Sequence, residues 1–126
     1  MRREARECAF KLIFDTLFKG TEEETQLEVI KPLKKDADKE FCKLIFDTYQ
    51  IHREKLEKDV ASHLKNFDIT RVYKIDLALV FMALTEIEFL DTPKPVAINE
   101  ALDISKKYST NDSSKFINGL LSAILG

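Results

Sequence analysis

Residues that interrupt helices are scarce in this chain. It has only three glycines and three prolines among 126 residues, and no glycine-rich turn or sustained alternation of apolar and polar residues occurs. Glycine and proline are the strongest local breaks in regular structure, so their scarcity favours long helices joined by short connections. The sequence therefore predicts an all-α protein.

Other absences narrow the class of protein. The two cysteines, Cys8 and Cys42, stand in helical patterns without the spacing of metal ligands, so we expect reduced, partly buried thiols. No apolar run approaches the roughly 20 residues that cross a bilayer. The chain opens on Arg2, Arg3 and Glu4 instead of the apolar core of a signal peptide. These features predict a cytoplasmic protein.

The charge balance does not by itself indicate a nucleic-acid-binding protein. The formal net charge is −2, with 44% hydrophobic and 33% charged residues, which is typical of a soluble globular chain. Any binding to nucleic acid must therefore come from local patches of charge. No internal repeat or low-complexity linker divides the sequence, and we expect one domain over residues 1–126.

Signatures of catalysis are also missing. The chain has no phosphate-binding glycine loop and no CxxC, HExxH or GxSxG motif. His52 and His63 are eleven residues apart but lack a clear third metal ligand. Glu100 and Asp103 are carboxylates without a partner nucleophile, expected on a solvated helix face. We expect neither an enzyme nor a cofactor or metal site.

Apolar periodicity predicts about six or seven helices in two small packed bundles. The helix over residues 71–89 is apolar on both faces and should be the most buried. Thr70 and Ser113 are candidate N-caps, and Gly119, inside the last helix, suggests a close backbone approach. The expected helices cover residues 3–19, 23–30, 38–65 and 71–89, with a further helix starting at or just before Asn99 and a last one starting at Ser113.

Residues 111–116 form a polar turn between the last two helical patterns. The turn gathers amide, carboxylate and hydroxyl groups with Lys115 and the aromatic Phe116. Unpaired N–H groups at a helix start, a cation and a ring suit the binding of a phosphate and a base. The same residues are equally suited to a capped helix start, and the pattern alone leaves both interpretations open.

The first helix carries a second candidate site, the sequence RREAREC. Arg2, Arg3 and Arg6 fall on adjacent positions of one helical face. Guanidinium groups pair with phosphates in bidentate fashion and stack on bases. The alternative is that Glu4 and Glu7 neutralise these arginines on a solvated face.

The chain resembles the NusB family of bacterial transcription antitermination factors in four segments that keep their order and spacing. These are RREARECA at residues 2–9 followed by Leu12-Ile13-Phe14, KIDLALVFMALTEI at 74–87, VAINEALDISKKY at 96–108 and NDSSKFINGLL at 111–121. The resemblance spans nearly the whole chain. It implies an all-helical fold of two packed bundles and no cofactor.

The resemblance also implies partners. Family members bind the boxA segment of nascent RNA together with NusE, a small-subunit ribosomal protein, and help RNA polymerase read through terminators, notably in ribosomal RNA operons. A homo-oligomer is compatible with the family. The residues implied to contact RNA are Arg2, Arg3, Arg6, Asp112, Ser113, Lys115 and Phe116, and those implied to contact NusE are Phe14 and Asp76.

Each implied role has a physical basis. The arginines and Lys115 would neutralise phosphates and make binding salt-dependent, while Phe116 would stack on an unpaired base. Asp76 would pair with a basic group of the ribosomal protein, and Phe14 would supply an apolar contact. Core packing is the alternative for Phe14 and Phe116, since both follow the helical spacing of other apolar residues.

Two other functions are compatible with the sequence. One is a NusB-like accessory domain of a ribosomal RNA cytosine methyltransferase, although no cofactor-binding domain accompanies these residues. The other is a helical protein-interaction module without RNA function. A partner pull-down and a gel shift with boxA RNA separate the interaction module from an antitermination factor.

Overall fold

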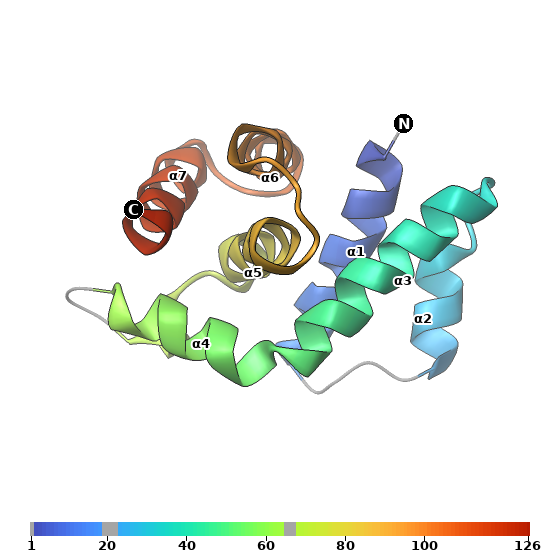
Figure 1. Ribbon diagram of the computed structural model, residues 1–126, viewed down its shortest axis with the longest axis horizontal. Helices are drawn as coiled ribbons and strands as arrows, with labels where there is room; N and C mark the ends of the chain where they lie inside the picture. The colour runs from blue at the N-terminus through green and yellow to red at the C-terminus, as the bar shows by residue number, and fades with distance from the viewer. Residues whose placement is uncertain (1, 19–22, 65–67) are drawn as a thin grey trace.

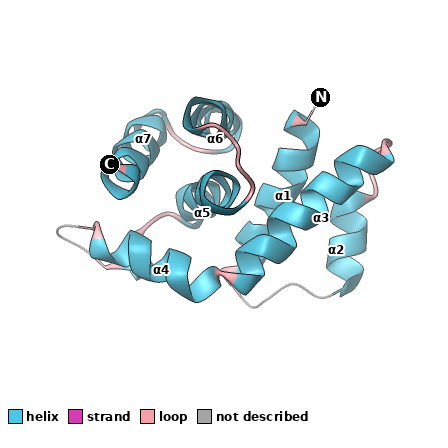
Figure 2. Ribbon diagram, in the orientation of Figure 1, coloured by secondary structure: helices cyan, strands magenta, loops and turns pink. Residues whose placement is uncertain are grey.

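The structure, a computed structural model, describes residues 2–18, 23–64 and 68–126. In these ranges every regular element is helical (Figure 2), as predicted. The elements are α1 (Arg3–Thr16), α2 (Glu23–Ile30), α3 (Asp36–Ile51), α4 (Arg53–Ser62), the 3-10 turn η1 (Ile69–Arg71), α5 (Lys74–Phe89), α6 (Lys94–Tyr108) and α7 (Asn111–Leu125).

The helices form two groups that meet along α1 and α5 (Figure 1). Helices α1, α2 and α3 lie on one side, and α5, α6 and α7 lie on the other, with α4 extending from α3 beneath the second group. Helix α1 packs against both α3 and α5, so it joins the groups. The predicted arrangement of two small packed bundles is confirmed.

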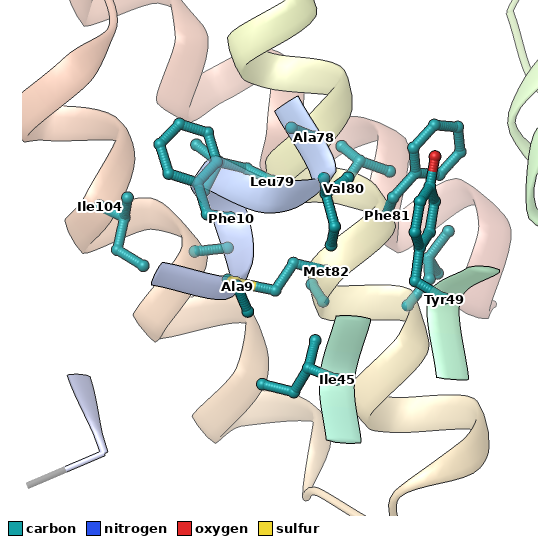
Figure 3. Packing of buried hydrophobic residues seen from close by; sticks show 14 of the residues in the cluster. Ala9, Phe10, Ile45, Tyr49, Ala78, Leu79, Val80, Phe81, Met82 and Ile104 are labelled. Carbon is teal, nitrogen blue, oxygen red and sulfur yellow. The ribbon is translucent and has the colours of Figure 1, made fainter. Parts of the chain in front are cut away.

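Helix α5 is the centre of the core. Every residue from Asp76 to Glu86 is buried, because α1, α3, α6 and α7 all pack against this helix. Figure 3 shows Met82 between Ala9 and Ile45, and Phe81 beside Tyr49. Each large apolar side chain buried here stabilises the fold by roughly 1.5–3 kcal/mol. The prediction that this helix is the most buried is correct.

The predicted continuous helix over residues 38–65 is wrong. The chain turns at His52, which separates α3 from α4, and α3 begins earlier than expected, at Asp36. The His52 ring stacks on Phe89 with centroids 3.7 Å apart and planes 7° apart. The turn directs α4 back toward the core, where Leu56 and Val60 are fully buried. Lys65 lies outside the described residues.

Several predicted helix boundaries also change. Helix α1 ends at Thr16, and Lys19 and Gly20, where the sequence suggested its end, lie outside the described residues. Thr70 is not an N-cap: it lies in η1, and its N–H donates to the Asp68 carboxylate at 3.2 Å. Helix α6 starts at Lys94, well before Asn99, because proline is tolerated in the first helical turn.

The last helix differs from the prediction at two positions. Its N-cap is Thr110, and Ser113 lies inside the first turn, where only 2% of it is exposed. Gly119 is exposed, and a Cβ atom built on it meets nothing within 4 Å. The expected close backbone approach at Gly119 is therefore absent within the described part of the chain.

The cysteines agree with the expectation of reduced thiols. Cys8 and Cys42 are buried free thiols, and burial raises the pKa of Cys42 to about 12. Among the described helices, none has the length and apolar character needed to cross a membrane.

Candidate nucleic-acid and protein-partner interface

The best-anchored arginine of the first helix is Arg6, whose side chain is buried. Its Nε and Nη2 donate to the Glu86 carboxylate at 2.8–3.0 Å, and its Nη1 donates to Glu100 at 3.1 Å. Arg6 is 6% exposed and Glu86 is fully buried. The guanidinium therefore links α1 to α5 and α6. A direct contact between Arg6 and RNA would require breaking this pair, so its burial argues against that predicted role.

Arg3 lies at the surface and turns toward α6. Its Nη2 donates to Glu100 at 2.6 Å and to Asp103 at 2.7 Å, and the hydrogen bond to Glu100 is the main cause that raises its pKa. The Arg3 side chain stays 43% exposed. Glu100 and Asp103 were expected on a solvated face. The structure instead places both in ion pairs, and the Glu100 side chain is only 15% exposed.

Arg2 packs on a different helix. Its guanidinium carbon lies 4.1 Å from the centre of the Phe41 ring on α3, within the range of a cation–π contact. The predicted single arginine face is thus divided, with Arg3 turned to α6 and Arg2 to α3. The acids that neutralise Arg3 come from α6 and not from the neighbouring positions of α1. Glu7 instead accepts hydrogen bonds from Lys107 and Tyr108.

Asp76 anchors the other end of the candidate site. It is 4% exposed, and its two carboxylate oxygens accept hydrogen bonds from the hydroxyls of Ser109, at 2.8 Å, and Ser113, at 3.0 Å. The connection between α6 and α7 is only Ser109-Thr110, so it holds both serines against the first turn of α5. The role of Ser113 in the fold is therefore to hold Asp76.

A hollow of about 230 Å³ opens beside this carboxylate. It brings together four of the predicted site residues, from segments that are distant in the sequence. Its lining residues are Arg71, Val72, Tyr73, Asp76, Thr110, Asp112, Ser113 and Phe116. Phe116 is half-buried, and Lys115, which is exposed, is not part of the lining.

A second hollow, of about 490 Å³, adjoins the first and shares Tyr73 and Thr110 with it. Tyr73 is 66% exposed and Phe18 is 63% exposed, which is unusual for large aromatic side chains. Phe14 packs edge-on against Phe18, with ring centroids 5.0 Å apart. The lining residues are Phe14, Phe18, Tyr73, Lys74, Ile75, Tyr108, Ser109 and Thr110. We call the two hollows together the aromatic groove.

Sequence reasoning missed Tyr73 and Phe18 as site residues. Tyr73 immediately precedes α5, and Phe18 follows the last turn of α1, whereas the sequence placed both inside predicted helices, over residues 71–89 and 3–19. Phe18 continues the helical spacing of Phe10 and Phe14, so the pattern indicated core packing and gave no signal of a site residue. Phe14 and Asp76, predicted together, line different halves of the groove.

The predicted RNA-binding arginines lie apart from the aromatic groove. Arg3 and Phe14, which lines the groove, stand at opposite ends of α1, which a rise of 1.5 Å per residue makes roughly 16 Å apart along the helix axis. The arginine end is also close to neutral, because Arg3 and Arg6 are paired with carboxylates. Its phosphate-binding capacity on its own is therefore small.

The histidines do not assemble a metal centre in the part of the chain that the structure describes. There, no group of three histidine, cysteine, aspartate or glutamate side chains could hold a metal ion. The His63 Nδ1 atom instead lies 2.7 Å from the backbone oxygen of Asp59.

Comparison with known proteins gives a consistent result. The family model described as "NusB family" matches residues 3–125. The transcription antitermination protein NusB of Staphylococcus epidermidis is 37% identical over 125 residues, covering 98% of this chain and 97% of that protein. The protein of the same name from Clostridium botulinum is 33% identical over 139 residues, covering 98% of this chain and 99% of its own length.

Solved structures agree in fold. A chain in the crystal structure of antitermination factors NusB and NusE in complex with dsRNA superposes with a TM-score of 0.89 at 28% identity, covering 98% of this chain and 94% of that chain. The solution structure of NusB from Aquifex aeolicus gives a TM-score of 0.84 at 29% identity, covering 98% and 86%.

Proposed function

The chain belongs to the NusB family of transcription antitermination proteins, and from that premise we propose that it is a non-catalytic adaptor. It binds boxA RNA jointly with the ribosomal protein NusE and joins them to the RNA polymerase antitermination complex in the cytoplasm. A relative of the same fold is solved with NusE and RNA, which supports both partners. The observation that carries the proposal is the aromatic groove.

The groove suits a protein partner. Its exposed rings, Phe18 and Tyr73, lie beside the half-buried Phe14 and offer an apolar surface to water that a partner would cover. Asp76 lines the adjoining hollow and accepts two hydroxyl hydrogen bonds. A basic side chain of NusE entering the hollow would meet a preorganised carboxylate. The apolar rim and the acid together favour a partner segment that carries an aliphatic and a basic residue.

RNA would bind beside this groove and at the arginine end. Phe116 and Asp112 line the hollow, with Lys115 exposed next to them, so an unpaired base and its phosphate have a ring and a cation within one helical turn. Arg3 keeps an exposed guanidinium at the other end of α1. Arg6 acts as a positioning residue, because its ion pairs fix α1 against α6 beside Arg3.

The balance of charge explains why two partners are needed. Carboxylates already neutralise Arg3, so RNA binding to this chain alone should be weak. NusE bound in the groove would supply further phosphate contacts and hold the RNA near the first surface. Two weak surfaces in one complex raise affinity through effective concentration, without either having to suffice alone.

The experiment measures both partners against matched variants. Tyr73→Ala should weaken NusE binding at least tenfold, about 1.4 kcal/mol, as the loss of a central aromatic contact does. Ile51→Ala is the control, because Ile51 is 77% exposed and lies on a different helix, outside the groove. Arg3→Ala should weaken RNA binding and reduce its salt dependence. If Tyr73→Ala binds NusE as wild type does, the groove is not the partner site.

A further inference from the structure

Two lysines flank one aromatic ring on the side of α1 that faces α6. The Lys107 and Lys11 Nζ atoms lie 5.3 Å and 5.8 Å from the centre of the Tyr108 ring. The ring also packs against Phe10, and its hydroxyl donates to Glu7 at 3.0 Å. The position lies between the arginine end of α1 and the aromatic groove, which Tyr108 also lines. A strand of RNA that reaches both ends must pass it.

Further lysines lie past α1 on the opposite side, in a hollow whose lining also holds three carboxylates. The hollow, of about 430 Å³, separates α1 from the connection between α2 and α3, and Lys11 lines it together with Lys34 and Lys35. Figure 1 shows this connection near the N-terminal half of α1. The complete lining is Glu4, Glu7, Cys8, Lys11, Val29, Pro32, Leu33, Lys34, Lys35 and Asp38.

These lysines differ from the arginines in their availability. Lys11, Lys34 and Lys35 form no salt bridge within 4.0 Å among the described residues, whereas the guanidiniums of Arg3 and Arg6 are held by carboxylates at 2.6–3.1 Å. Carboxylates do line the hollow, and Glu7 is already paired with Lys107 at 3.2 Å. A phosphate meets cations here without first displacing a bound carboxylate from them.

We propose that Lys11, Lys34 and Lys35 form a lysine band across α1 that binds the phosphate backbone of single-stranded RNA. Exposed ammonium groups beside an aromatic ring, here Tyr108 next to Lys11, are typical of surfaces that bind a flexible single strand without recognising its sequence. The band would guide the strand that passes the arginine end. This inference depends on the proposed RNA-binding function and adds to it a surface that the arginine motif does not include.

The occupant is RNA and not a protein segment because the available groups are charged. Large apolar side chains are scarce in the lining, where Leu33 is 5% exposed, so a partner helix would find little to bury. Phosphate contacts by ammonium groups need no desolvated apolar centre and depend strongly on salt. The salt dependence of binding therefore separates the two occupants.

The test compares Lys34→Gln/Lys35→Gln with a control that removes the same charge, Lys43→Gln/Lys58→Gln. Lys43 and Lys58 are exposed on α3 and α4, they do not line this hollow, and they form no salt bridge among the described residues. Binding of a boxA oligonucleotide and of a scrambled strand is measured in the presence of NusE, from about 50 to 200 mM salt. Each lost phosphate contact lowers the slope of log K against log salt by about 0.7 for a single strand, so the band variant should lose about 1.4.

The expected result has three parts. The ratio of the RNA affinity of wild type to that of the band variant should shrink about sevenfold across that salt range. The band variant should lose the same affinity for the boxA and the scrambled RNA, and the control variant should bind both as wild type does. An unchanged slope in the band variant overturns the inference. A variant that loses NusE affinity instead assigns the surface to the protein partner and also overturns it. If wild type with NusE binds no RNA at all, the proposed function itself fails, which is a distinct outcome.

Discussion

Arg6 offers the most demanding test of the structure, because sequence reasoning and geometry give it different roles. The sequence places it with the arginines that contact RNA, whereas the structure buries its guanidinium against Glu86. Glu86 has no exposed surface and is otherwise held by the Thr92 hydroxyl, at 3.1 Å. Arg6→Ala would therefore leave a buried carboxylate without its cation.

The expected cost follows from that burial. Removing one partner of a buried ion pair destabilises a protein by about 3–5 kcal/mol. An unfolding entropy of about 2.1 cal/mol/K per residue gives about 0.26 kcal/mol/K for 126 residues, so Tm should fall by roughly 11–19 °C. Arg3→Ala, which removes an exposed guanidinium, should lower Tm far less than Arg6→Ala does.

The assay is urea unfolding followed by circular dichroism, with RNA binding measured at a temperature at which each variant is folded. Replacing both partners, as Arg6→Met/Glu86→Leu, should recover most of the stability, because a well-packed apolar pair can replace a buried ion pair. An Arg6→Ala variant that loses less than about 1 kcal/mol would refute the burial argument. In that case Arg6 would be as available to RNA as Arg3.

Three further predictions follow. Gly119→Ala should raise the free energy of unfolding by about 0.5–1 kcal/mol in urea denaturation, because the site is an exposed helix interior with nothing within 4 Å of the added Cβ; a destabilised variant would contradict this. Burial raises the pKa of Cys42 from 9.0 to about 12, so its stabilising contribution is complete below pH 9 and is lost as the pH rises toward 12. The urea midpoint should therefore fall less between pH 8 and 10.5 in Cys42→Ala than in wild type, and equal falls would count against the burial. Asp103→Asn should raise RNA affinity and steepen its salt dependence by releasing one carboxylate from Arg3, which a filter-binding titration measures; unchanged binding would show that Asp103 does not compete with phosphate.

The fold was predictable because its main determinants are local. Apolar periodicity marked α5 as the buried centre, and scarce glycine and proline indicated helices throughout. The break at His52 was not predictable, because neither glycine nor proline marks it. It accompanies a stack on Phe89, 37 residues further along the chain, and the packing of α4.

The site was predictable only as a set of residues. The sequence singled out Asp76 and Ser113 separately, but their hydrogen bond joins positions 37 residues apart, so no local pattern could reveal it. Arg6 and Glu86 are 80 residues apart, and their pairing likewise comes from the packing of α1 on α5. Helical spacing identified the polar side chains. Only the tertiary structure shows which of them form hydrogen bonds or ion pairs inside the fold and which stay available to a partner.

The adaptor role is tested most directly by the affinity for boxA RNA with and without NusE, measured by fluorescence anisotropy at fixed salt. Effective concentration predicts that the pair of proteins binds RNA at least a hundredfold more tightly than this chain alone. Tyr73→Ala should abolish most of that gain while leaving the weak binding of the chain alone unchanged. Equal RNA affinity with and without NusE would contradict the account.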